Sequence, residues 1–398
     1  MPWLQSQMLK IIVVGAGING TTAAIELTRR GHKVILLDPG PLPHPLAAST
    51  DISKAVRAAY GADEDYTALA ERSMEVWREW NAQFDAELYH EVGFLFLRRH
   101  AMQPGDFEFE SFNLLQKRGH QLERMSPTRL RQRFPAWNAE CYEDGFFEAS
   151  AGYVESGRVV AELIKRAKSL GVESRQGYRF AELDEADDRV RGVVLGNGDR
   201  IEGDSVVFAV GAWTPYLLPF TRDLFRATGH PVFHLKPRDP KLFMAERFPI
   251  FGADISTTGY YGFPLSREGV VKVANHGPGR EMSPDSAQRV VTADEENKLR
   301  EFLSGTFPAL LDAPIVYTRI CMYCDTHDGN FWIAPDPERP GLILATGDCG
   351  HGFKFAPVLG EIIADAVEGK DNPLLQKFRW RPEIRAGAAK EAARFKPE

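Results

Sequence analysis

The strongest constraint on the fold is a glycine-rich turn that directly follows a short apolar segment near the start of the chain. Residues 9–14 predict a strand, and Gly15, Gly17 and Gly20 precede a helical pattern over residues 21–30. Gly15 permits the tight turn, Gly17 lets the backbone approach a pyrophosphate, and Gly20 lets the helix pack close to the strand. The pattern therefore predicts a strand–turn–helix unit whose helix N-terminus binds a dinucleotide phosphate.

A second strand and an acidic residue follow at the spacing expected of such a unit. Residues 33–37 predict this strand, and Asp38 ends it, 18 positions after Gly20. An acid about 20 residues beyond the glycines is expected on a ribose hydroxyl. A chance glycine turn would not explain strand, helix and acid together, although the motif leaves NAD and FAD open. The expected nucleotide-binding residues are Gly15, Gly17, Ile18, Asn19, Gly20 and Asp38.

Length and charge limit the class of protein. A chain of 398 residues, 43% of them hydrophobic, is long enough for roughly two to three domains. The net charge of −7 and the lack of long like-charge runs argue against a nucleic-acid or membrane surface. The apolar stretches are strand-sized, and the first seven residues do not resemble a secretory signal. Four cysteines are too few for a disulfide framework, so we expect a location in the reducing cytoplasm. As a separate prediction, we expect the protein to be a monomer.

The α/β pattern returns in the middle of the chain. A helical segment over 156–170 is followed by a predicted strand at 171–173. Residues 190–201 predict a hairpin around a Gly-Asn-Gly-Asp turn. Residues 204–213 predict a buried strand that ends in a glycine turn. These segments indicate an α/β sheet that resumes after an insertion.

Other segments have a different residue pattern and predict the inserted domain. Phenylalanines alternate with other residues within 89–98, at Phe94 and Phe96, and residues 109–119 predict a helix. Residues 228–280 are rich in Pro, Gly and aromatic residues, which indicates strands of a mixed sheet. The expected fold class is α/β, with a discontinuous Rossmann-like dinucleotide-binding domain and an inserted α+β substrate domain built on a mixed sheet. We expect the active site at their junction. The dinucleotide domain is expected at 1–86, 152–220 and 320–398, and the substrate domain at 87–151 and 221–319.

A second glycine-rich loop lies between the last predicted strand, 341–346, and the last long helix, about 357–367. Pro357 suits the first turn of this helix and Gly369 lies just past its end. The loop aims backbone N–H groups, reinforced by the helix dipole, at the carboxyl edge of the sheet. A flavin ring that becomes negative on reduction would be stabilised there.

Five motifs, in this order, resemble the monomeric sarcosine oxidase family of FAD-dependent amine oxidases. The family's relatives include N-methyltryptophan oxidase, pipecolate oxidase and the fructosyl-amino-acid oxidases. The motifs are the first glycine turn and residues 207–213, 261–264, 321–323 and 350–354. They span nearly the whole chain, and the C-terminal motif is the most specific. The further FAD-binding residues that the resemblance implies are Lys54, Gly211, Trp213, Cys321, Met322, Gly350, His351, Gly352, Phe353 and Lys354.

In this family, the cysteine at the position of Cys321 forms a thioether to the flavin. The attachment requires a thiolate, so positive charge nearby should help. A buried structural cysteine is the plainer interpretation of the residue alone. Its spacing to Lys354, 33 positions later, favours attachment. Cys324 and His327 also leave a dithiol or metal role open, although no fourth ligand is evident at a suitable spacing.

The resemblance implies that Arg57 and Lys354 hold a substrate carboxylate, because an Arg fork and a Lys point charge both suit this anion. Solvated surface cations are the alternative, which is stronger for Arg57 within its helical pattern. Lys272 matches the family's oxygen-activating lysine, although a strand lysine usually points to water. His276 and Tyr261 match residues that shape the pocket, and either could instead be a satisfied core residue.

Two positions depart from the sarcosine oxidase pattern. Lys54 stands where an arginine stacks near the flavin, which keeps a cation but loses the planar stacking and is closer to the fructosyl-amino-acid oxidases. Cys349 stands where a serine is usual and could be a reactive thiol or a tightly packed residue. The identity of the substrate is therefore left open.

The predicted function is FAD-dependent oxidation of the C–N bond of an N-substituted or secondary α-amino acid. The imine product hydrolyses, and O2 reoxidises the flavin to give hydrogen peroxide. One alternative is a flavin dehydrogenase of similar amines that passes electrons to a quinone or an electron-transfer protein. Another is a non-catalytic flavoprotein subunit, which would have no need of Arg57, Lys354 and Cys321. We expect no metal and no nucleic-acid or membrane partner.

Overall fold

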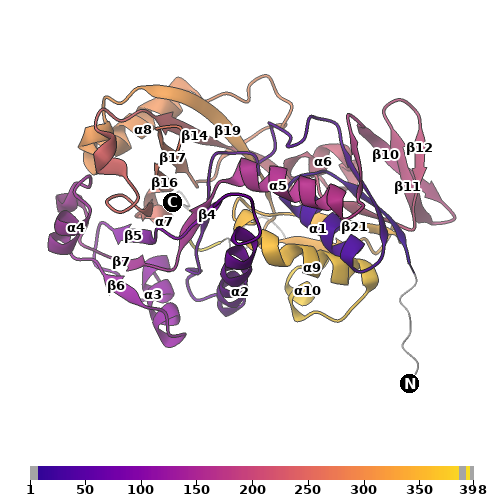
Figure 1. Cartoon of the computed structure of the whole chain (residues 1–398), viewed down its shortest axis with the longest axis horizontal. Helices are drawn as coiled ribbons and strands as arrows, with labels where there is room; N and C mark the ends of the chain where they lie inside the picture. The colour runs from indigo at the N-terminus through magenta and orange to yellow at the C-terminus, as the bar shows by residue number, and fades with distance from the viewer. Residues whose placement is uncertain (1–7, 385–390, 395–398) are drawn as a thin grey trace. The chain divides into compact units, whose positions relative to one another are not determined.

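The computed structural model describes residues 8–384 and 391–394, and the chain forms two compact units (Figure 1). Each unit is assembled from three separate segments. Unit 1 comprises Met1–Asp51, Ser156–Ala227 and Tyr323–Ala389, and unit 2 comprises Ile52–Glu155, Thr228–Met322 and Lys390–Glu398. Among the described helices, none is long and apolar enough to cross a membrane.

A six-stranded sheet forms the centre of unit 1, in the order β20-β21-β13-β1-β2-β9. Strand β20 runs antiparallel to β21, whereas the other neighbours are parallel. The inner strands are apolar and buried along nearly their whole length, as expected when both faces of a parallel sheet are covered. The strands are β1 (Lys10–Val14), β2 (Lys33–Asp38), β9 (Glu173–Gln176), β13 (Ser205–Phe208), β20 (Trp332–Pro335) and β21 (Leu342–Thr346).

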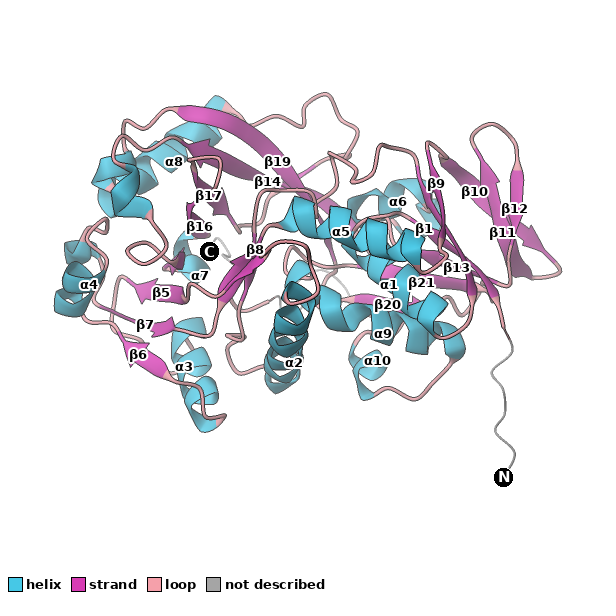
Figure 2. Ribbon diagram, viewed as in Figure 1, coloured by secondary structure: helices cyan, strands magenta, loops and turns pink. Residues whose placement is uncertain are grey.

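Helix α1 (Ile18–Arg29) packs against α9 (Ala356–Glu368) and α5 (Ser156–Ser169), and Figure 1 shows the three beside this sheet. Helix α9 has a proline in its first turn, and Gly369 follows it with a left-handed φ of 64°, as its sequence predicted. A separate three-stranded antiparallel sheet contains the expected hairpin (Figure 2). The other elements of unit 1 are β10 (Phe180–Ala186), β11 (Arg189–Leu195), β12 (Arg200–Glu202), α6 (Thr214–Leu217) and α10 (Pro373–Lys377).

A mixed sheet of nine strands forms the centre of unit 2, in the order β18-β14-β17-β16-β15-β5-β7-β6, with β19 paired to β14. A small second sheet has the order β3-β8-β4. The strands are β3 (Lys54–Val56), β4 (Tyr89–His90), β5 (Phe94–Arg98), β6 (Leu122–Arg124), β7 (Asp144–Glu148), β8 (Gly152–Val154), β14 (Arg226–Leu235), β15 (Ile250–Ala253), β16 (Tyr260–Leu265), β17 (Val271–Asn275), β18 (Arg280–Glu281) and β19 (Ile315–Asp325). The helices are α2 (Glu64–Asn81), α3 (Phe107–Lys117), α4 (Pro127–Arg133), α7 (Ile255–Thr258) and α8 (Ala293–Thr306).

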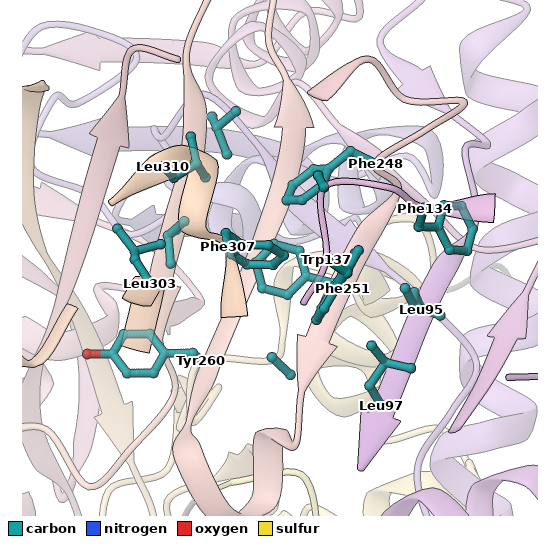
Figure 3. Packing of buried hydrophobic residues seen from close by; sticks show 14 of the residues in the cluster. Leu95, Leu97, Phe134, Trp137, Phe248, Phe251, Tyr260, Leu303, Phe307 and Leu310 are labelled. Carbon is teal, nitrogen blue, oxygen red and sulfur yellow. The ribbon is translucent and has the colours of Figure 1, made fainter. Parts of the chain in front are cut away.

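An aromatic cluster forms the core of unit 2 against this sheet (Figure 3). At its centre is Phe307, which lies just past the end of α8. The centroid of the Phe307 ring lies 4.5 Å from that of Trp137 and 4.9 Å from that of Phe251. Edge-to-face contacts of this kind add to the stabilisation from burial alone. The cluster includes residues of β15, β16 and β17, and the predicted site residues Tyr261 and Lys272 stand on the last two of these strands.

The predicted α/β fold class is confirmed, but several boundaries differ. Residues 52–86, 152–155 and 320–322 belong to unit 2 rather than to the expected dinucleotide domain, and residues 221–227 belong to unit 1. Strand β8 pairs with both β3 and β4, which joins these segments in unit 2. Residues 391–394 also belong to unit 2. The predicted strand at 171–173 begins only at Glu173, since Gly171 takes a left-handed φ of 96° in the preceding turn.

Candidate cofactor and substrate sites

The first glycine turn of unit 1 has the geometry that its sequence predicted. Gly15 has a φ of 99°, and a Cβ placed on Gly20 would lie 1.8 Å from the Gly15 carbonyl oxygen. No side chain larger than glycine therefore fits at Gly20 without moving the strand or the helix. A Cβ on Gly17 would have Ser49 Oγ as its nearest neighbour, at 3.5 Å. The backbone of Gly17 is thus open to the close approach of a ligand.

The beginning of α1 offers amide groups to an anion. Within the described chain, no side chain caps the first turn of α1, and this turn contains no acidic residue. Its N–H groups, from Ile18 to Gly20, carry the positive end of the helix dipole. The buried Asp38 carboxylate, at the end of β2, accepts hydrogen bonds from the amides of Ala16 at 2.9 Å and Gly40 at 3.0 Å. Glycine turn, uncapped helix and acid together fit the diphosphate and ribose of a dinucleotide such as FAD.

The C-terminal glycine loop of unit 1 is tightly packed. A Cβ on Gly350 would lie 2.1 Å from the ring of Tyr323, so the aromatic residue requires a glycine opposite it. The His351 side chain lies 3.1 Å from the Gly329 carbonyl oxygen. Lys354 is 5% exposed, and its Nζ donates to the His351 carbonyl oxygen at 2.7 Å. Lys354 is therefore a buried cation and not the solvated surface lysine that was the alternative.

Asp348 is a residue of this loop that sequence reasoning missed. Its carboxylate accepts a hydrogen bond from Asn19 Nδ2 at 2.9 Å, which joins the loop to the beginning of α1. Burial raises the pKa of Asp348 to about 6, and the hydrogen bond from Asn19 works in the opposite direction. The signal available in the sequence was an acid placed between a buried strand and a glycine loop.

The neighbouring residues Gly211 and Trp213 lie on the turn after β13, where Gly211 has a left-handed φ of 55°. The Gly211 carbonyl oxygen accepts from the Thr214 hydroxyl at 2.7 Å. The Trp213 ring meets His44 edge to face, with centroids 5.7 Å apart. Both predicted residues thus follow the carboxyl end of a central strand of the sheet in unit 1.

In unit 2, Cys321 lies beside a cation. The Lys54 ammonium is 3.6 Å from the Cys321 sulfur, and Cys321 is 3% exposed. The structure thus places a positive charge next to the sulfur of Cys321. The predicted FAD ligands Lys54, Cys321 and Met322, which is also buried, belong to the same unit.

Among the described residues, Cys324 and Cys349 form no disulfide, whether with Cys321 or with each other. Cys324 stands three positions further along β19, so its side chain points to the opposite face of the strand. Burial raises the pKa of Cys324 to about 12, and its sulfur accepts from the Thr346 hydroxyl at 3.3 Å. Cys349 contacts Thr326 at 3.3 Å. Within the described residues, no group of three or more His, Cys, Asp or Glu side chains is arranged to hold a metal ion.

Lys272 is a buried strand lysine. It stands on β17, which is paired on both sides, to β14 and β16. It is 1% exposed, and its Nζ donates to the Ser53 carbonyl oxygen at 2.6 Å and lies 4.5 Å from the centre of the Phe263 ring. The expectation that a strand lysine points to water does not apply to this one. A buried ammonium next to an aromatic face can stabilise a nearby anion.

Arg57 is likewise buried, at 6% exposed, although the sequence left a surface position open. Its guanidinium carbon lies 4.7 Å from the centre of the Tyr60 ring and 5.5 Å from that of Phe107. Nη2 donates to Glu391 at 2.8 Å, whereas Nη1 contacts no acceptor among the described residues. One terminal nitrogen of the guanidinium is therefore available to a further anion.

His276 meets the same carboxylate. Its Nε2 lies 2.8 Å from Glu391 Oε2. Burial lowers the pKa of His276, and the Glu391 carboxylate works in the opposite direction. The Tyr261 ring is edge-on to His276, with centroids 6.4 Å apart. The structure thus brings Arg57, His276 and Tyr261 together in unit 2. Glu391 was missed by sequence reasoning because it lies 37 positions beyond Lys354 in a segment without a motif.

Comparison with known proteins matches this chain to a family of oxidoreductases over most of its length. The family model described as FAD dependent oxidoreductase matches residues 10–366. Monomeric sarcosine oxidase from Bacillus sp. (strain B-0618) is 27% identical over 367 residues, covering 90% of this chain and 92% of the relative. N-methyl-L-tryptophan oxidase from Salmonella arizonae is 27% identical over 376 residues, covering 93% and 97%.

Solved structures show the same fold. The fructosamine oxidase of Aspergillus fumigatus (Amadoriase II), in complex with FSA, superposes with a TM-score of 0.84 at 25% identity. The match covers 98% of this chain and 93% of that structure. The similarity therefore extends over both compact units of the chain.

Proposed function

Because this chain belongs to the FAD dependent oxidoreductase family, we propose that it is an FAD-dependent oxidase of N-substituted or secondary α-amino acids. The resemblance to the monomeric sarcosine oxidase family is confirmed by its relatives, which are named as oxidases of sarcosine and N-methyl-L-tryptophan. The reaction breaks the C–N bond of the substrate in two stages. Oxidation of the amine gives an imine, and water then hydrolyses the imine to an amine and a carbonyl compound.

The observation that carries the substrate class is the environment of Arg57. Its guanidinium is buried beneath aromatic rings, already binds a carboxylate, and retains one terminal nitrogen without an acceptor among the described residues. A buried guanidinium binds carboxylates through strong, directional hydrogen bonds. We propose that Arg57 binds the carboxylate of an amino-acid substrate. We propose that Tyr261 and His276 shape the pocket around this carboxylate.

The residues of unit 1 described above support FAD as the cofactor. The glycine turn, the uncapped beginning of α1 and Asp38 would hold the diphosphate and ribose. FAD, when bound, supplies the two-electron acceptor for the oxidation. We further propose that Cys321 attaches the flavin covalently, and the Lys54 ammonium beside its sulfur supports this role.

Lys272 favours an oxidase over a dehydrogenase. A buried ammonium stabilises negative charge on oxygen as oxygen is reduced, whereas a quinone or a protein acceptor has no need of it. We therefore propose O2 as the final electron acceptor and hydrogen peroxide as its product. The roles of Lys354, Gly211 and Trp213, the monomeric state and the cytoplasmic location stay predictions.

A peroxide-coupled screen of the purified yellow protein tests this function. The panel contains N-methyl, cyclic and fructosyl amino acids, each with its carboxamide as a matched control. We expect peroxide from at least one acid and much less from its carboxamide. Turnover only with an artificial dye in place of O2 would indicate the dehydrogenase. No flavin reduction by any secondary amine under anaerobic conditions would contradict the proposal.

A further inference from the structure

A carboxylate from the end of the chain lies between two predicted substrate-site residues. Glu391 accepts from Arg57 Nη2 through Oε1 at 2.8 Å, and its Oε2 lies 2.8 Å from His276 Nε2. The side chains of all three residues are at most 7% exposed. The Glu391 side chain thus makes the contacts that a substrate carboxylate would make with the same guanidinium.

Binding a second carboxylate to Arg57 while Glu391 stays in place is electrostatically unfavourable. Arg57 has one guanidinium for both, and like charges close together in a buried site repel strongly because the medium screens them poorly. Arg57 Nη1 has no acceptor among the described residues, so an entering anion can contact the guanidinium before Glu391 leaves. The arrangement suits the exchange of one carboxylate for another.

A second contact fixes Glu391 in place. Arg394, three positions later and 4% exposed, donates through Nε to the Gly277 carbonyl oxygen at 3.0 Å and through Nη2 to the Pro278 carbonyl oxygen at 3.4 Å. These carbonyls directly follow His276 in the chain. The segment 391–394 is therefore anchored to the same loop that carries one of the two Glu391 partners.

We propose that Glu391 is a specificity-determining residue that competes with the substrate carboxylate for Arg57. A ligand must displace the Glu391 carboxylate from Arg57 to bind fully. The apparent affinity for carboxylates is therefore the intrinsic affinity multiplied by the fraction of molecules in which Glu391 is not bound to Arg57. Ligands without a carboxylate do not compete with it. This inference rests on the proposed role of Arg57 in binding the substrate carboxylate.

The test measures binding and not turnover. Acetate and acetamide are titrated into the holoenzyme by calorimetry, with the wild type compared to Glu391→Gln. We expect the variant to bind acetate roughly 5- to 100-fold more tightly, the usual range of coupling between two sites, and to bind acetamide as the wild type does. Glu383→Gln is the matched control, because Glu383 is exposed and pairs only locally with Arg379 among the described residues. It should leave both affinities unchanged.

A second variant tests the same competition without changing the Glu391 side chain. Arg394→Ala removes the anchor without changing Arg57, His276 or Glu391, and it should also tighten acetate binding. Unchanged or weaker acetate binding in both variants, with normal thermal unfolding, would overturn the proposal and make Glu391 a support for Arg57. The double variant Arg57→Ala/Glu391→Gln separates the two proposals. If it retains the tighter acetate binding, Arg57 is not the carboxylate ligand and the proposed function fails at that residue.

Discussion

The ammonium of Lys54 lies 3.6 Å from the sulfur of Cys321, although the two residues are 267 positions apart in the chain. Positive charge beside a sulfur complements the negative charge that the sulfur carries when it attacks an electron-poor carbon. The pair therefore gives a physical basis for covalent flavin attachment.

Covalent attachment predicts that flavin fluorescence travels with the acid-denatured polypeptide on a gel. Cys321→Ser should abolish this fluorescence. Lys54→Met should slow its appearance during reconstitution, because the positive charge beside the sulfur is then lost. Lys54→Arg, which keeps the positive charge, is the control and should restore attachment. Flavin released from the denatured wild-type protein would show that Cys321 is a structural cysteine.

Arg57→Ala should weaken the binding of carboxylate substrates and inhibitors by roughly 1.5 to 3 kcal/mol, the scale of a charged hydrogen bond. Amidated analogues should bind weakly to the wild type and be nearly indifferent to the change. Titration of both ligand types into wild type and variant measures the difference. Equal losses for acid and amide would indicate a folding defect.

Lys272→Met should separate the two half-reactions. Oxidation of the substrate makes no use of the ammonium, so anaerobic flavin reduction should stay within about tenfold of the wild type. Reoxidation by O2 should slow by orders of magnitude, because oxygen acquires negative charge as it is reduced. Stopped-flow absorbance follows both steps, and Lys241→Met, which removes an exposed charge in the same unit, is the control. Unchanged reactivity with O2 would remove the main support for an oxidase.

Gly20→Ala should destabilise the protein by about 1 to 3 kcal/mol and reduce FAD retention, because the added Cβ would lie 1.8 Å from the Gly15 carbonyl oxygen. Gly305→Ala is the opposite case. Gly305 lies in helix α8, where a Cβ meets no described atom within 4 Å. Alanine there should stabilise the protein by up to about 1 kcal/mol. Thermal unfolding should show a lower unfolding temperature for Gly20→Ala and a higher one for Gly305→Ala. The same change in unfolding temperature for both variants would argue against tight packing at Gly20.

Glu108→Gln tests a buried acid in unit 2. Burial raises the pKa of Glu108 to about 8, while Arg98, 3.8 Å away, works in the opposite direction. The unfolded chain ionises near the ordinary glutamate pKa of 4.5, so between that pH and about 8 the folded state binds more protons than the unfolded state. Stability due to this residue therefore falls as the pH rises through that window.

The variant has no such proton, so its unfolding temperature relative to the wild type should rise from about pH 5 to about pH 8. Exposed Glu268→Gln is the control. A constant difference across this window would show that Glu108 is ionised in the folded protein.

The sequence by itself determined the features that depend on neighbours in the chain. The glycine turn at Gly15 to Gly20, the acid Asp38 and the proline and glycine that delimit α9 all follow from local backbone geometry. The buried strands were recognisable from apolar runs. These features were enough to predict the α/β class and the dinucleotide-binding turn at the start of α1.

Only the tertiary structure decided the environment of the charged side chains. Burial depends on which distant segments pack on a residue, and no local pattern encodes it. Lys272 is buried because β17 is paired on both sides, and Arg57 is buried because Tyr60 and Phe107 cover it. Glu391 meets Arg57 across 334 positions of chain. Long-range packing thus determined which of the predicted cations are held in place and what they contact.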